Sequence, residues 1–169
     1  MKTKLISLLT ILMLALSSTC LAADWQWTKS NANAGFFFDK ETIHYGMTNG
    51  QIDKDKIYVW LRVVLDDAYA QKKNVGKNHP PFKTLTGKYL YNSQRNTIQR
   101  LKIYGYAKNG SLLIRNEKPK YPLEIVPASL FDDTAHALKQ YAKKHDKEIT
   151  DRTNHHYKKA GHSPQVTSL

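Results

Sequence analysis

The chain has 169 residues, and its 26 basic and 14 acidic side chains give it a net charge of +12. This length suits one domain and excludes two well-buried ones. The basic excess favours anionic partners such as phosphorylated polymers, sulfated glycans, acidic proteins or membrane surfaces, without choosing among them. The alternative interpretation is that scattered lysines serve solubility.

Residues 1–23 have the order of a secretory signal peptide. Lys2 and Lys4 precede an apolar run from Leu5 to Leu16, and small residues follow up to Ala23. The run is shorter than the roughly 20 residues that span a membrane core. We therefore expect a cleaved signal, no transmembrane span afterwards, and an exported protein in the periplasm, on the cell surface or in the medium.

Cys20 is the one cysteine of the chain and lies where a lipidated cysteine could begin a bacterial lipoprotein. Thr19 precedes it, whereas such cysteines usually follow Gly, Ala or Ser. Ordinary cleavage is therefore the expected course. The mature chain then has no cysteine, which excludes disulfides, thiolate metal sites and a cysteine nucleophile.

Strand signals dominate the first part of the mature chain. An apolar run at residues 35–38 ends in a turn at residues 39–42. Residues 57–65 read as the central strand, with Ile57, Val59 and Leu61 on one face and Tyr58, Trp60 and Arg62 on the other.

Three further runs, at residues 85–91, 97–107 and 111–115, are rich in β-forming side chains. Asn109-Gly110 lies between the last two and indicates a tight hairpin, because both residues tolerate the positive φ of a type I′ turn. Consecutive antiparallel strands follow from this pattern.

Near the C-terminus, Ser129 can cap a helix while Asp132 lies three residues further on, close to a capping-box arrangement. Apolar residues then recur at helical spacing up to residue 142. The sequence predicts an α+β domain over residues 24–149, with an antiparallel sheet of about five to six strands and a C-terminal helix packed on one face. Residues 150–169 are expected to form a basic, histidine-containing flexible tail.

Several segments in this order resemble the surface-adhesin E-like family of small bacterial exported proteins: WQW, FFFDKETIHYG, KIYVWLRVVLDD, YLYN, RLKIYGYAKNGSLL and LEIVPASLFDDTAHAL. The resemblance covers about residues 25–145. It implies an antiparallel sheet with a C-terminal helix, and adhesion to host or matrix proteins. The chain departs from the pattern by lacking the cysteines that many relatives carry in the mature domain.

The candidate binding site is the face of the sheet opposite the core, an aromatic and basic platform that can stack rings and pair with anions. The alternative is that the helix covers these aromatics as ordinary core. The candidate residues are Tyr58, Trp60, Arg62, Arg100, Lys102, Tyr104 and Tyr106.

No cofactor and no metal site are expected. The histidines of the tail, His155, His156 and His162, could offer imidazole ligands, but their spacing is not specific and solvated side chains are the favoured interpretation. No catalytic fingerprint is present, so we expect no enzyme.

The leading hypothesis is therefore an adhesin-like binding protein with a macromolecular partner such as a host or matrix protein. Two alternatives remain: a periplasmic module that binds anionic polymer or envelope components, and a structural dimer subunit without catalytic activity. We expect a protein or anionic polymer as partner, no specific nucleic acid, and allow for a homodimer.

Overall fold

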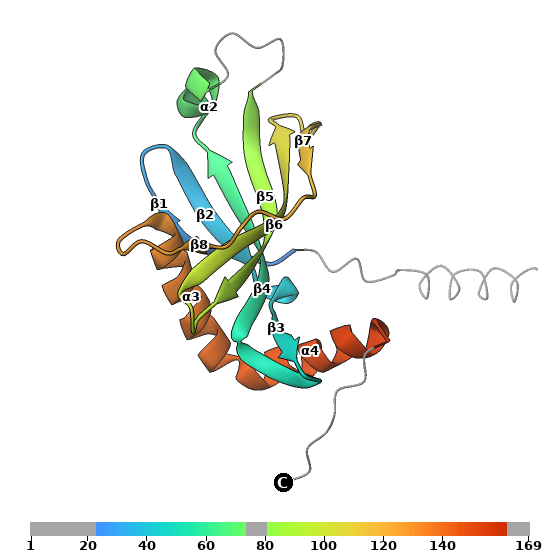
Figure 1. The fold of residues 1–169 in the computed structure, drawn as a ribbon. Helices are drawn as coiled ribbons and strands as arrows, with labels where there is room; N and C mark the ends of the chain where they lie inside the picture. The colour runs from blue at the N-terminus through green and yellow to red at the C-terminus, as the bar shows by residue number, and fades with distance from the viewer. Residues whose placement is uncertain (1–22, 74–80, 162–169) are drawn as a thin grey trace, which may run out of the picture.

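The computed structural model of the protein describes residues 23–73 and 81–161. One antiparallel sheet forms the fold, with one helix packed on a face and a further helix at each end (Figure 1). Its elements in chain order are β1 (Trp25–Ser30), β2 (Ala34–Asp39), the 3-10 turn η1 (Lys40–Thr42), β3 (His44–Thr48), β4 (Gln51–Leu65), α2 (Asp67–Lys73), β5 (Phe82–Asn92), β6 (Thr97–Ala107), β7 (Leu112–Asn116), β8 (Leu123–Glu124), α3 (Leu130–Lys144) and α4 (Asp146–Lys159).

The strands follow the order β1-β2-β4-β5-β6-β7, with β3 pairing alongside β4 and β8 alongside β6. Tight turns set this order. Asn49 and Gly50 have φ of 53° and 78° and join β3 to β4, and Gly110 has φ of 84° between β6 and β7. Positive φ at both residues is what the two-residue loop at Asn49-Gly50 requires. The type I′ turn expected at Asn109-Gly110 is wrong, because Asn109 does not have positive φ. The Ala107 N–H donates to the Ser111 carbonyl oxygen at 2.9 Å, so residues 108–110 form a three-residue loop that ends in Gly110. The predicted α+β fold with an antiparallel sheet is confirmed.

One face of the sheet forms the main core. Phe38, Val59 and Tyr91 are at most 1% exposed, and α3 covers them with Leu138, which is also 1% exposed. α3 begins as predicted, because Ser129 Oγ accepts a hydrogen bond from the Asp132 N–H at 3.2 Å. We call this side of the sheet the covered face.

α4 packs against β3, at the end of the sheet opposite α2 (Figure 1). Thr153 Oγ1 accepts the Tyr45 N–H at 2.9 Å, and Arg152 donates to the carbonyl oxygens of Lys40 and Ile43 at 2.7 and 3.0 Å. These side chains satisfy backbone groups that an uncovered strand edge would leave free for another chain.

The structure differs here from the flexible tail expected from residue 150. Residues 150–159 belong to α4, whose buried side chains are Ile149 and Thr153. Two buried positions in an otherwise polar helix give no apolar stripe, so the sequence pattern did not indicate the helix. Residues 162–169 lie outside the described residues.

A bulge changes the faces within β6. Lys102 pairs with Lys88, but Arg100 pairs with Tyr89, so Leu101 is the extra residue. Tyr89 packs against the core cluster beneath α3, and residues directly opposite each other on neighbouring strands point to the same side. Arg100 therefore lies on the covered face.

The predicted signal peptide lies almost wholly outside the described residues and stays a prediction. Within residues 23–73 and 81–161, no helix combines the length and hydrophobicity needed to cross a membrane.

Candidate binding face

The second face of the sheet carries aromatic and basic side chains that no helix buries as core. Alternation along the paired strands places Tyr58, Trp60 and Arg62 of β4 on this side, with Lys102, Tyr104 and Tyr106 of β6. Between them β5 contributes Thr84, Thr86, Lys88, Leu90 and Asn92. These side chains are only partly buried. We call this side the open face.

Its centre is a cluster of rings and cations. The Trp60 and Tyr104 rings are stacked, with centroids 5.9 Å apart and planes 18° apart. Lys102 Nζ lies 5.9 Å from the centroid of the Trp60 ring. A cation at this distance is attracted by the negative face of the ring, and the attraction grows when water is excluded. The rings therefore help to hold the lysine in place.

Lys88 and Lys102 face each other directly on neighbouring strands. Like charges in this position are destabilising. Burial lowers the pKa of Lys88 and the charge of Lys102 adds to that effect. In the part of the chain that the structure describes, neither lysine forms an ion pair. Hydrogen bonds from Tyr104 and Arg115 lower the pKa of Glu117, and Lys102 is near enough to that carboxyl to contribute. None of the described carboxylates lies within ion-pair distance of either lysine.

At one end of the open face, Arg62 lies over the Trp25 ring at 5.5 Å, and its Nε is shielded from solvent without a hydrogen-bond partner. The two residues line a pocket of about 300 Å³, the Trp25 pocket. Lys83 and Lys108 also line it, and both bind Asp67, at 2.7 and 3.0 Å. Arg62 thus brings a charge that none of the described carboxylates neutralises.

At the other end lies a pocket of about 450 Å³, the Asn92 pocket. Its lining is mainly polar: Thr48, Asp53, Asp55, Lys56, Asn92, Gln94, Arg95, Thr97 and Gln99, with Leu90 and Pro122. Asp53 accepts from Thr48 at 2.8 Å and pairs with Lys56 at 3.0 Å, while Asp55 accepts from Ser93. The carboxylates are therefore held in position by neighbouring donors.

A histidine pair borders the open face beside Tyr58. His44 is 7% exposed; its ring stacks on Tyr58 at 5.1 Å and lies 4.3 Å from the ring of His156 in α4. Burial lowers the pKa of His44 to about 4, against a hydrogen bond to Thr42 that raises it, and Lys88, His156 and Arg152 lower it further. His44 is thus neutral at neutral pH, and Nδ1 donates to the Thr42 carbonyl oxygen at 2.8 Å.

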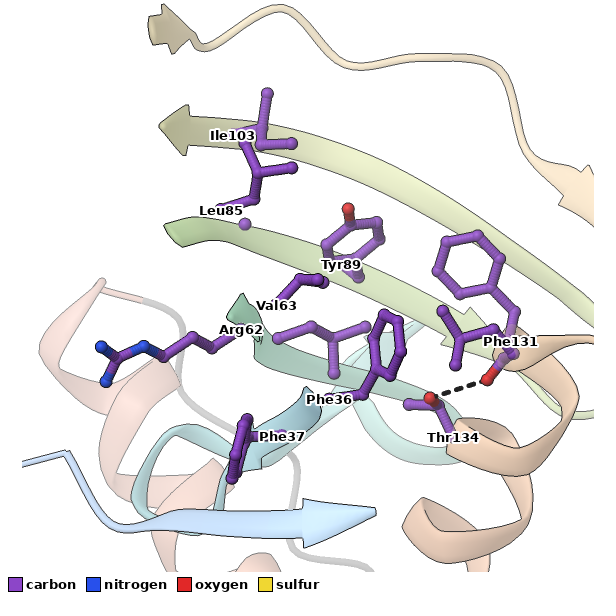
Figure 2. A pocket seen from close by; sticks show the side chains of 12 residues that line it. Phe36, Phe37, Arg62, Val63, Leu85, Tyr89, Ile103, Phe131 and Thr134 are labelled. Atoms are coloured by element: carbon purple, nitrogen blue, oxygen red, sulfur yellow. Dashed lines mark hydrogen bonds between the residues drawn. The ribbon is translucent and has the colours of Figure 1, made fainter. Parts of the chain in front are cut away.

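The covered face holds a cavity of about 80 Å³ between the sheet and the start of α3. Phe36, Tyr89 and Phe131 turn toward this space in Figure 2, whereas Arg62 extends away from it. The lining is mostly apolar, without the convergent polar groups of a specific ligand site. The open face is therefore the stronger candidate.

The structure places six of the seven residues expected in the site together on the open face. Arg100 is the exception, because the bulge at Leu101 turns it to the covered face. The expected alternative, that the C-terminal helix covers the aromatics of this face, is wrong, since α3 packs on the opposite side.

The sequence-based site missed Lys88 and Trp25. A signal for Lys88 was present, since Tyr89 and Tyr91 alternate with it and belong to the covered face. Trp25 had no such signal, because its place beside Arg62 depends on how β1 pairs with β2.

Two of the three candidate metal ligands belong to the part of the chain that the structure describes. His155 and His156 are exposed residues of α4, and His162 lies outside the described residues. Among residues 23–73 and 81–161, no three His, Cys, Asp or Glu side chains gather closely enough to hold a metal ion.

No family model matches the sequence, and a search of the curated proteins finds no match. Two solved structures are similar in fold. One is Haemophilus influenzae protein E, at 17% identity and a TM-score of 0.49, covering 74% of this chain and 91% of that chain. The other is protein E from non-typeable Haemophilus influenzae, at 12% identity and 0.46, covering 77% and 88%.

Proposed function

We propose that the protein is an exported, adhesin-like binding protein that holds a negatively charged macromolecule of an extracellular surface on its open face. The observation that carries the proposal is the opposed pair of Lys88 and Lys102 beside the Trp60 ring, with no described carboxylate within ion-pair distance of either lysine. A folded protein that keeps such a pair loses stability, and an incoming anion restores it.

The open face also suits binding better than catalysis. The charged groups at its centre are cations, and its rings offer stacking surfaces, but none of the described side chains there forms a nucleophile and base pair. A large partly exposed aromatic surface is uncommon on a protein without a partner. Residues 1–23, read as a signal peptide, support a role outside the cytoplasm.

A matrix or host protein fits this face if the surface of that protein is negatively charged. A negatively charged polymer of the bacterial envelope would bind the same residues, so the open face can bind its partner outside the cell or within the envelope. Both cases share one requirement, which is that binding weakens as salt screens the charges.

The test compares charge changes on the two faces of the sheet. The purified protein is passed over immobilised heparin, polyglutamate and polyphosphate, with dextran and polylysine as uncharged and cationic controls. We expect retention on at least one anionic polymer. The variant Lys88→Gln/Lys102→Gln should lose it, while Lys139→Gln/Lys143→Gln on α3 should keep it. Equal loss in both variants, or no retention on any anionic polymer, would refute the proposal.

A further inference from the structure

We infer that the negatively charged macromolecule is a linear anionic polysaccharide, and that it lies along strand β5 from the Trp25 pocket to the Asn92 pocket. The inference rests on the proposed function, because it names the chemistry of the ligand that the open face holds.

The two pockets belong to one track. Thr84 and Thr86 line the Trp25 pocket, Leu90 and Asn92 line the Asn92 pocket, and Lys88 lies between them on the same side of β5. From Thr84 to Asn92 the strand advances by roughly 26 Å, since each residue of an antiparallel strand rises about 3.3 Å. A small molecule would fill one pocket, whereas an extended polymer reaches both.

The centre of the track combines rings with separate positive charges. Trp60 and Tyr104 present nearly parallel rings, and the apolar faces of sugar rings pack on such aromatic surfaces. Arg62, Lys88 and Lys102 lie around them on three strands and can each pair with a sulfate or carboxylate group. Acid groups repeated along a polymer match this alternation of ring and charge.

The Asn92 pocket decides between classes of anionic polymer. It contains two carboxylates, Asp53 and Asp55, two cations, Lys56 and Arg95, and the amides of Asn92, Gln94 and Gln99. Lys56 pairs with Asp53 at 3.0 Å. Because two carboxylates balance the two cations, the pocket offers a phosphate chain or an acidic peptide no net attraction. Its carboxylates accept hydrogen bonds from hydroxyl groups, and its amides both donate and accept. A polysaccharide carries hydroxyls between its acid groups, so it is the polymer that satisfies both the cationic centre and this pocket.

The experiment measures binding of the purified protein to heparin-derived oligosaccharides by isothermal titration calorimetry. An octasaccharide, which is long enough to extend beyond the cationic centre toward the two pockets, is compared with a disaccharide. We expect the octasaccharide to bind about tenfold tighter or more, a difference of about 1.4 kcal/mol. Polyglutamate and polyphosphate should bind at least as weakly as the disaccharide.

Two variants test the track with matched controls. Gln94→Glu adds a negative charge in the Asn92 pocket, and Gln140→Glu adds the same charge at an exposed position of α3. Lys102→Gln removes a charge at the centre, and Lys143→Gln removes one on α3. We expect Gln94→Glu and Lys102→Gln each to weaken octasaccharide binding about fivefold or more, which is about 1 kcal/mol, while the two controls leave it unchanged.

The outcomes separate this inference from the proposed function. If polyglutamate or polyphosphate bound as tightly as the octasaccharide and still depended on Lys102, the open face would remain a binding surface but the polysaccharide assignment would be wrong. An octasaccharide no tighter than the disaccharide, or insensitive to Gln94→Glu, would also overturn it. If no anionic probe bound, or if Lys143→Gln weakened binding as much as Lys102→Gln, both proposals would fail.

Discussion

The two faces of the one sheet use aromatic residues in different ways. On the covered face Tyr91 is fully buried beneath α3 and packs with aliphatic neighbours such as Val59 and Leu138. On the open face Trp60 is partly exposed and its neighbours are Tyr104 and Lys102. An aromatic ring is therefore a poor guide to burial by itself, and its neighbours across the strands distinguish a core from a binding surface.

The largest loss of stability should come from a substitution on the covered face. Leu138→Ala removes a side chain that is 1% exposed in the main core and should lower the free energy of unfolding by about 2–5 kcal/mol, because of lost burial and the cavity left behind. Urea denaturation measures the change. Heparin retention of the folded variant should stay as in the wild type. A loss below about 1 kcal/mol would mean that α3 is not the cover of this face.

Burial of His44, where α4 meets the open face, should make the free energy of unfolding depend on pH. The folded pKa of His44, about 4, lies below its ordinary value of 6.5, so the unfolded chain binds more protons between these values. The stability that neutral His44 provides is full above pH 6.5 and is lost as the pH falls through 4. The loss should reach at most about 3 kcal/mol.

Unfolding by urea between pH 4 and 7 measures this slope. His44→Asn keeps a side-chain donor for the Thr42 carbonyl oxygen but does not titrate, so its slope should be shallower than that of the wild type. Equal slopes in the two proteins would show that His44 does not carry the effect.

Two threonines of α4 test whether hydrogen bonds anchor this helix to the edge of β3. Thr153→Val removes the acceptor of the buried Tyr45 N–H and should cost about 1–3 kcal/mol of unfolding free energy. Thr150→Val is the matched control, because Thr150 Oγ1 is shielded from solvent without a hydrogen-bond partner, and its loss should be neutral or stabilising. Thermal unfolding of both variants measures the difference. The same loss in both would argue against an anchored α4.

The smallest expected effect is a gain in the stability of the free protein. Lys102→Gln relieves the repulsion from Lys88 and should stabilise the free protein by about 0.2–1 kcal/mol, less whatever the contact with Trp60 contributes. Lys143→Gln on α3 is the control and should change stability less. If Lys102→Gln destabilised the protein clearly, the lysine pair would be structural and the main argument for an anion site would be lost.

The sequence predicted the alternation along β4, a hairpin around Asn109-Gly110 and the start of α3, because each depends on local chemistry. The expected turn type in that hairpin was wrong, since only Gly110 has positive φ and the loop has three residues. It did not predict the face of Arg100, since one extra residue in β6 reverses the alternation and leaves no composition signal. It also missed α4, because Ile149 and Thr153 bury little apolar surface and the helix is anchored by hydrogen bonds to β3. The Asn92 pocket combines residues from three separate segments, 48–56, 90–99 and Pro122, which only the tertiary structure brings together.

The most direct test of the account is a nuclear magnetic resonance titration of the isotope-labelled protein with the heparin-derived octasaccharide, followed through the backbone amide signals. We predict shifts that follow β5 from Thr84 to Asn92 and include Lys102 and Tyr104, while the amides of α3 around Leu138 stay unchanged. Shifts centred on α3 or α4 would contradict the assignment of the open face as the binding surface. The absence of any shift at an octasaccharide concentration that saturates binding in the calorimetric titration would contradict it as well.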